Sequence, residues 1–468
     1  KRTTLHLGEV QSGKTLTMCS AIALAYDNNF LISTILTGTK NILKAQNQDR
    51  IKEVLNAIDS GNTKFIYYSE PTDNDQLRTQ LKDLTKKKKF IANKMIVFTM
   101  LKHQNSIKRL SKIFTSEDLN VSSYQIRSLI LDDEADQASP NTQARKNKRS
   151  PINNSIIELR KDHPKFCTYI QVTATAQPLF LIDKDDPMSP DFISVSDTPK
   201  AYIGIKNYFL TKKRREKFVI KIEEDDIPEP DDSSAFMPQK LQEALDHYIV
   251  ATAISETLEK PLKPPFTFLC HPDWRKEEHN RYEAWIRKYI NKLKEQILDE
   301  DYEENAHEAL KIPFEKAISN LEKSSISYEK IKNNVGKILE SNIAIRIIND
   351  KFPIEEANLK DFWNKSNYHI IIGGNCIERG FTVEGILVTY MSRNPGKNSD
   401  SIQQRARFCG FKNLNHFLLS RLWLDEENIT FFKKYILHEE TIRKSIQENI
   451  NEYKPHAKEG FEMPLVKP

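Results

Sequence analysis

Glycine is scarce in this sequence, and its distribution indicates where the backbone meets a ligand. The chain has only 13 glycines in 468 residues, whereas an average composition of about 7% would give roughly thirty. Most of them lie in a few short segments, containing Gly8, Gly13, Gly38, Gly373–Gly385 and Gly410. A chain that concentrates its few glycines in this way typically uses them for close approach of the backbone to a ligand.

Paired cysteines, long apolar runs and a large excess of one charge are missing as well. The five cysteines include no C-x-x-C pair, which excludes a disulfide framework and a zinc module. No apolar run reaches the roughly 18–20 residues that a membrane span requires. The net charge of +5 is far from that of a histone-like tail, so nucleic-acid binding would need local patches. We therefore expect a cytoplasmic protein without a membrane partner.

The order of apolar runs predicts the fold class. In the first half, short apolar runs alternate with helical patterns, which is typical of a parallel sheet with crossover helices. The predicted strands are 3–7, 31–36, 65–68, 95–100, 129–131 and 169–172, and then 266–270, 343–348, 368–372 and 386–391. The acidic, proline-containing segment 223–234 separates the two series, and we expect a linker or insertion there. The chain starts at Lys1, only seven residues before its first motif, so we expect it to be part of a longer protein.

The first motif is a phosphate-binding loop. Residues 8–15, GEVQSGKT, satisfy the pattern G-x-x-x-x-G-K-[ST] between a predicted strand and a predicted helix. We expect Gly8, Gln11, Ser12 and Gly13 to form the cradle, Lys14 to reach the β- and γ-phosphates of ATP, and the Thr15 hydroxyl to bind Mg²⁺.

The second motif is an apolar strand that ends in carboxylates. Residues 129–136, LILDDEAD, place Asp133 where a magnesium ligand belongs and Glu134 where a base would activate the attacking water. Asp132 is an additional acid, for which a solvated or helix-capping carboxylate is the favoured interpretation. Four carboxylates after a buried strand are costly unless a cation or an arginine lies nearby.

Three further segments complete a recognisable order. Thr173-Ala174-Thr175 follows a predicted strand, and the segment 373–380 with Arg379 follows another. Arg405 and Arg407 lie in a helix-like stretch, where one of them could act as an arginine finger or both could form a solvated face.

This succession resembles motifs I, II, III, V and VI of superfamily 2 helicases. More closely, the chain resembles the Z-one domain family, which is found in endonucleases and prokaryotic conflict systems. The residues that carry the resemblance are GEVQSGKT at 8–15, LTGTKNILKAQNQDRI at 36–51, DDEADQASPNT at 132–142, VTATAQPLF at 172–180, YIGIKNYF at 202–209, GGNCIERGFTVEG at 373–385 and SIQQRARFCGFK at 401–412.

The resemblance implies an α/β fold with two RecA-like parallel-sheet lobes that enclose ATP. We expect a first lobe at 1–222, an acidic linker or insertion at 223–240, a second lobe at 241–412 with a helical insertion at about 278–340, and a helical C-terminal segment at 413–468. It also implies Arg407 as the finger, with Lys412 or Arg405 in reserve, because the family's final arginine would fall near Gly410.

By the same resemblance, a nucleic-acid strand should cross both lobes. Small, hydroxyl and basic groups suit phosphate contacts that do not depend on the base sequence. For His271, a buried or capping role is an equally good interpretation, and the lysine run 86–89 is favoured as a solvated face. The candidates are Thr37, Gly38, Thr39, Thr99, Lys102, His271 and Arg379.

The implied function is a nucleic-acid-dependent ATP hydrolase with ATP and Mg²⁺ as cofactors. The leading hypothesis is a DNA translocase or helicase motor of a restriction or anti-phage defence system, with DNA favoured over RNA. The alternative is an ATP-switched nucleic-acid sensor that recruits or licenses a partner nuclease without translocating. The motifs contain no nuclease centre, so if cleavage occurs we expect the nuclease before Lys1, after Pro468 or in a partner chain. The expected partner is a nuclease or a regulatory ATPase.

Overall fold

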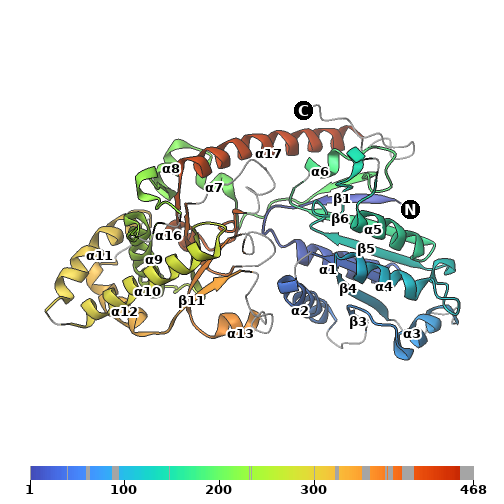
Figure 1. Ribbon diagram of the computed structural model, residues 1–468, viewed down its shortest axis with the longest axis horizontal. Helices are drawn as coiled ribbons and strands as arrows, with labels where there is room; N and C mark the ends of the chain where they lie inside the picture. The colour runs from blue at the N-terminus through green and yellow to red at the C-terminus, as the bar shows by residue number, and fades with distance from the viewer. Residues whose placement is uncertain are drawn as a thin grey trace. The chain divides into compact units, whose positions relative to one another are not determined.

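A computed structural model of the chain divides into two compact units, which Figure 1 shows as ribbons and which are described separately below. The first unit comprises residues 1–198 and 442–468, and the second comprises residues 199–441. The structure describes residues 2–38, 41–59, 64–86, 94–146, 148–175, 177–230, 232, 234–299, 301–321, 326–349, 359–374, 377, 383–392 and 405–453.

The first unit is built on a parallel sheet. Its strands, in spatial order, are β3 (Phe65–Ser69), β4 (Met95–Leu101), β2 (Phe30–Thr37), β5 (Arg127–Asp133), β6 (Phe166–Thr173), β1 (Thr3–Leu7) and β7 (Phe192–Val195). Each neighbouring pair runs parallel. Because parallel strands have their carboxyl ends at the same edge, the segments that follow β5, β6 and β1 are neighbours in space.

Helices cover both faces of this first sheet, as Figure 1 shows. Along β5, Leu129 and Leu131 face one apolar core, whereas Ile130 between them faces the other. This two-residue period is that of a strand buried on both faces. The core of Leu129 and Leu131 includes α1 (Lys14–Asp27) and α2 (Asn41–Ile58), and the core of Ile130 includes α3 (Asp75–Lys86), α4 (Gln104–Phe114) and α5 (Pro151–Asp162). A short helix, α6 (Gln177–Phe180), follows β6.

The second unit contains another parallel sheet. Its strands, in spatial order, are β11 (Ile343–Ile348), β12 (Tyr368–Gly373), β10 (Phe266–His271), β13 (Ile386–Met391), β15 (Arg421–Leu424) and β9 (Val219–Lys221). An antiparallel pair, β8 (Tyr202–Ile203) and β14 (Gly410–Phe411), lies beside it in the same unit.

The long helices of the second unit share one apolar core with its sheet. They are α9 (Gln239–Thr257), α10 (Lys276–Leu298), α11 (Glu303–Ile318) and α12 (Tyr328–Glu340). The shorter helices are α7 (Ile205–Phe209), α8 (Lys212–Phe218), α13 (Leu359–Asn364) and α16 (Leu414–Leu419). The last helix, α17 (Glu426–Tyr453), is continuous, and its residues up to Thr441 belong to the second unit whereas those from Ile442 belong to the first.

The predicted fold class, two parallel sheets flanked by helices with a helical insertion, is confirmed. The two units have other bounds than the expected lobes at 1–222 and 241–412. Five short strands were not predicted: β7, β8, β9, β14 and β15. Strand β9 pairs with β15, so the chain enters the second sheet before the acidic segment, and the units divide after Thr198.

The acidic segment itself is attached to the second unit. The Asp226 carboxylate accepts hydrogen bonds from the backbone N–H groups of Gln239 and Lys240, both at 2.8 Å. It therefore accepts from backbone N–H groups at the start of α9 that have no partner within the helix, where the helix dipole also favours a negative charge.

A helix that crosses a membrane needs about 20 predominantly apolar residues. Within the part of the chain that the structure describes, no helix is both long enough and apolar enough to cross a membrane.

Candidate active site

The phosphate-loop motif forms a tight turn between β1 and α1. Gly13, the residue before the helix, has φ of 85°, in the left-handed region that favours glycine. A Cβ at Gly8 would lie 2.9 Å from Lys14 Cγ, so the loop closes too tightly there for a side chain. The amide of Gly8 donates to the Thr173 carbonyl at 3.0 Å, which fixes the loop to the end of β6. The sequence therefore builds a tight turn, with glycine at both of its ends, at a helix N-terminus, where backbone amides and the helix dipole favour an anion.

The carbonyl of Glu9 is the internal anchor of this loop. It accepts hydrogen bonds from Lys14 Nζ at 2.9 Å, from Ser12 Oγ at 2.9 Å and from the Ser12 amide at 3.3 Å. The Lys14 ammonium thus lies over its own loop. To bind a phosphate, as predicted, it would have to exchange the Glu9 carbonyl for a phosphate oxygen.

The carboxylates lie at the end of β5, two strands away from the loop. Glu134, the first residue after the strand, has φ of 50°, which is uncommon for a residue with a side chain. Its amide donates to Asp133 Oδ1 at 3.0 Å, and the following residue, Ala135, donates to the Val172 carbonyl of β6 at 3.1 Å. Backbone strain of this kind persists where surrounding contacts enforce it and often marks functional sites.

Asp132 is not the solvated or capping carboxylate that was favoured from the sequence. Its side chain is fully buried, and it forms an ion pair with Lys102 at 2.7 Å. The Tyr169 hydroxyl of β6 donates to its other oxygen at 2.5 Å. The cation that the carboxylate cluster requires is therefore the ammonium of Lys102.

Lys102 also holds the backbone of the carboxylate motif. Its ammonium donates to the carbonyls of Asp133 at 2.7 Å, Glu134 at 2.8 Å and Gln137 at 3.2 Å. The side chain is 1% exposed. A phosphate contact, the role predicted for Lys102, would require it to leave four acceptors, so the contacts favour a positioning role.

The Thr-Ala-Thr segment joins the other two motifs. Thr173 Oγ1 donates to Asp136 Oδ1 at 2.5 Å and accepts from the Thr175 amide at 2.9 Å, while the Thr173 carbonyl holds Gly8. One residue of β6 therefore contacts the phosphate loop through its backbone and the carboxylate motif through its side chain.

The electrostatics of the carboxylates fit a bound cation. Burial, reinforced by the adjacent Glu134 carboxylate, raises the pKa of Asp133 to about 7, although the Lys14 and Lys102 ammonium groups oppose this shift. Burial also raises the pKa of Asp136. A divalent cation beside Asp133 would offset the cost of ionising it. With the glycine cradle and the helix N-terminus, these residues fit a magnesium nucleotide, which Thr15 and Asp133 would hold through the metal.

The nucleic-acid candidates of the first unit lie at the expected edge, but their side chains are covered. Thr37 is fully buried and donates to the Met100 carbonyl at 3.0 Å, and Thr99 is 6% exposed. The Lys102 amide donates to the carbonyls of Thr37 at 3.1 Å and Gly38 at 3.4 Å. The structure thus brings three of these candidates together through the backbone. Thr39 lies outside the described residues.

In the second unit, His271 ends β10 and is 1% exposed, with its Nδ1 3.1 Å from the Gly373 carbonyl. Of the two interpretations of this histidine, the buried one agrees with its position in the structure. Arg379 lies outside the described residues, and its predicted role stays a prediction.

Of the three basic residues proposed for the arginine finger, Arg405 and Arg407 are buried in the second unit and Lys412 is half-buried there. Arg407 is 8% exposed and Arg405 is 2% exposed, which excludes the solvated helix face. Lys412 donates to the Ile386 carbonyl at 2.8 Å and to the Tyr208 hydroxyl at 3.3 Å, and burial lowers its pKa to about 7. These contacts favour a structural role for Lys412, and the finger role of Arg407 stays a prediction.

One contact at the phosphate loop was not predicted from the sequence. Arg443 of α17 donates to the Gly8 carbonyl at 3.1 Å and lies 3.5 Å from the Glu9 carboxylate. Nothing in the local sequence around this arginine indicates the contact, since 435 positions separate it from Gly8.

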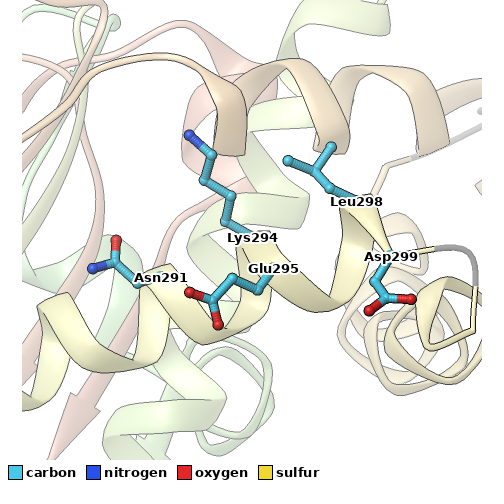
Figure 2. A pocket seen from close by; sticks show the side chains of 5 residues that line it. All are labelled: Asn291, Lys294, Glu295, Leu298 and Asp299. Atoms are coloured by element: carbon cyan, nitrogen blue, oxygen red, sulfur yellow. The ribbon is translucent and has the colours of Figure 1, made fainter.

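A pocket on the second unit lies apart from these motifs. It is lined by Asn291, Lys294, Glu295, Leu298 and Asp299, all from α10 and the residue that follows it (Figure 2). None of these residues belongs to a motif noted in the sequence, so the pocket contributes nothing to the candidate site.

A comparison with known protein families supports the resemblance for part of the chain. The family model of the Z1 domain matches residues 240–460, which confirms the resemblance to the Z-one family over this part of the chain. A search of curated proteins found no match.

Several solved structures are similar to this chain at low sequence identity. The ATP-dependent type ISP restriction-modification enzyme LlaBIII bound to DNA is 11% identical, with a TM-score of 0.50, covering 94% of this chain and 28% of that chain. The Mycobacterium smegmatis helicase Lhr, bound to single-stranded DNA and AMP-PNP, is 11% identical with a TM-score of 0.45, covering 94% of this chain and 46% of that chain. A variant of S. cerevisiae Dbp5, bound to RNA and ADP BeF3, is 11% identical with a TM-score of 0.44, covering 93% of this chain and 83% of that chain. At this identity, the match to the restriction enzyme shows the fold alone.

Proposed function

We propose that this chain is a nucleic-acid-dependent ATPase, and specifically a DNA translocase or helicase motor of a restriction or anti-phage defence system. The observation that carries the proposal is the convergence of three motifs at one sheet edge. The phosphate loop follows β1, Thr173 ends β6, and Asp133 and Glu134 stand at the end of β5, in three adjacent strands. This is the arrangement that phosphoryl transfer to water requires, because catalysis depends on positioning and charge stabilisation.

The residues have separate roles in this proposal. The loop amides and Lys14 bind the phosphates of ATP, while Thr15 and Asp133 hold Mg²⁺. The metal, when bound, neutralises charge on the β- and γ-phosphate oxygens. Glu134 orients the attacking water and accepts its proton. Lys102 holds the backbone of the carboxylate motif, and Thr173 fixes the distance between the loop and the carboxylates.

The nucleic-acid and defence parts of the proposal are supported by the Z1 match and by the fold shared with a DNA-bound restriction enzyme. We further propose DNA rather than RNA as the track and a partner nuclease in a cytoplasmic assembly. A separation of functions is therefore proposed, in which this chain uses ATP and another protein cuts.

The test is ATP hydrolysis with and without single- and double-stranded DNA and RNA. Glu134→Gln should bind ATP but lose hydrolysis, whereas Glu117→Gln, an exposed glutamate of the same unit, should behave like the parent. Stimulation by one polymer would identify the track. Parental turnover by Glu134→Gln would remove Glu134 from its role, and a parent that neither binds nor hydrolyses ATP would overturn the proposal.

A second assay separates a motor from a sensor. Directional displacement of a labelled strand or of a bound roadblock requires translocation, whereas a switch would hydrolyse ATP without moving. Stimulated hydrolysis with no displacement on any polymer would favour the sensor.

A further inference from the structure

The last part of α17 packs against the element that carries the phosphate loop. Ile442 and Ile446, one helical turn apart, are 8% and 4% exposed. They share an apolar cluster with Leu5 and Leu7 of β1 and with Ala135, the residue after Glu134. This segment of the helix therefore rests on the strand that precedes the loop and beside the carboxylate motif.

Arg443 lies between these two isoleucines in the sequence and reaches the loop itself. One terminal nitrogen donates to the Gly8 carbonyl at 3.1 Å, and Nε lies 3.5 Å from the Glu9 carboxylate. The side chains are only 12% and 22% exposed, so solvent screens the pair less than it would screen a surface ion pair. An arginine suits this place because its planar fork can serve a carbonyl and a carboxylate at once.

The two residues that Arg443 contacts are those on which the loop conformation depends. The amide of Gly8 is bonded to Thr173, and the carbonyl of Glu9 receives Lys14 and Ser12. Arg443 therefore holds the Gly8 carbonyl and the Glu9 carboxylate, while the Glu9 carbonyl anchors Lys14. A loop held from both sides is ordered before ATP arrives, which reduces the entropy lost on binding.

We propose that Arg443 is a positioning residue of the phosphate loop, acting through Glu9 and Gly8, and that α17 thereby sets the affinity for ATP. The inference rests on the proposed ATPase function and adds a regulatory helix to it. Arg443 contacts the loop and not the nucleotide, so its loss should weaken ATP binding and leave the chemical step largely unchanged.

The test compares Arg443→Ala, Arg443→Lys and Glu9→Gln with a matched control. Lys444→Ala removes the neighbouring cation, which is 78% exposed and pairs only with Glu448 of the same helix among the ion pairs described here. The dissociation constant of a fluorescent ATP analogue, KM, kcat and the melting temperature are measured for each full-length variant.

We expect Arg443→Ala to raise the dissociation constant and KM by about tenfold while kcat and the melting temperature change little. Arg443→Lys should recover part of the affinity, because an ammonium can still pair with Glu9. Glu9→Gln should reproduce part of the loss, and the double variant should lose less than the sum of the two. Lys444→Ala should match the parent.

Several outcomes would overturn the inference. A purely structural role of Arg443 would lower the melting temperature without changing ATP affinity in the folded protein. If Arg443→Ala does not fold, Glu9→Gln, which leaves the helix intact, decides the question, and unchanged affinity in that variant refutes the contact's role. If the parent and all the variants bind ATP equally well, only this inference is refuted. If the parent itself binds no ATP, the proposed function is refuted as well.

Discussion

Replacing Lys102 by methionine tests whether a buried cation supports the carboxylate motif. Methionine keeps much of the apolar stem and removes the ammonium, which has an ion pair with Asp132 at 2.7 Å and three backbone acceptors. The variant would leave the Asp132 carboxylate buried with Tyr169 as its remaining described partner. Breaking one side of a buried ion pair costs about 3–5 kcal/mol, a large share of the roughly 5–15 kcal/mol that stabilises a domain.

The location of tryptophan makes this loss measurable in one unit. The four tryptophans, Trp274, Trp285, Trp363 and Trp423, all lie in the second unit, so their fluorescence follows that unit alone. Circular dichroism follows the helices of both. With a urea dependence of about 2–3 kcal/mol per molar, we expect the transition seen only by circular dichroism to move down by about 1–2.5 M, while the fluorescence transition stays in place.

Two further variants complete the design. Lys112→Met, at an exposed position of α4, should leave both transitions unchanged. Adding Asp132→Asn to Lys102→Met should recover a large part of the loss, because the uncompensated charge is gone.

The result that would refute the positioning role is a Lys102→Met protein with parental stability. If that protein also lost stimulation by nucleic acid, the phosphate contact predicted from the sequence would be the better description of Lys102.

Three other substitutions test separate parts of the account. Lys14→Ala should abolish ATP turnover, because the phosphates lose their cation, and near-parental hydrolysis would refute the site. Arg407→Ala should lower kcat by about 10³-fold or more with little change in ATP affinity if it is the finger, and an effect confined to affinity would exclude that role. Lys412→Met should remove a pH dependence of the second unit: burial lowers the pKa of Lys412 from 10.5 to about 7, so the unfolded chain binds the extra proton between these values and stability rises with pH. Urea unfolding followed by fluorescence should show a parent that gains about 2 kcal/mol more than the variant between pH 7 and pH 9, and equal gains would contradict the shift.

The parts of the site that the sequence predicted are those that depend on local geometry. The strands 3–7, 343–348 and 386–391 were predicted with their observed bounds, because apolar runs between polar turns determine them. The phosphate loop was predicted because its glycines, lysine and threonine must follow one another at fixed spacing around a single turn. Strands β9 and β15 were missed because they are short and depend on pairing with distant segments, β15 with β13 and β9 with β15.

The side-chain environment of the motifs could not be predicted in the same way. Lys102 and Asp132 are 30 positions apart in the sequence, and their pairing depends on β2 lying between β4 and β5 in the sheet. The interpretation of Asp132 as solvated was wrong because an aspartate before a turn has the same local signature whether or not a distant lysine covers it. His271 illustrates the same limit, since burial and exposure at a strand end were equally compatible with its sequence.

The contacts of Lys102 and Arg443 divide the site into a precise part and an adjustable part. Lys102 is buried in the first unit and holds the carboxylate motif through several acceptors, so its contribution should be constant. Arg443 holds the phosphate loop with two partly accessible contacts from a helix that also contains residues of the second unit. Loss of the Arg443 contacts would loosen the proposed phosphate loop, whereas Lys102 would still hold the carboxylate motif. Regulation of this site is therefore expected to act first on nucleotide affinity, and variants of α17 should separate affinity from turnover more cleanly than variants of the motifs themselves.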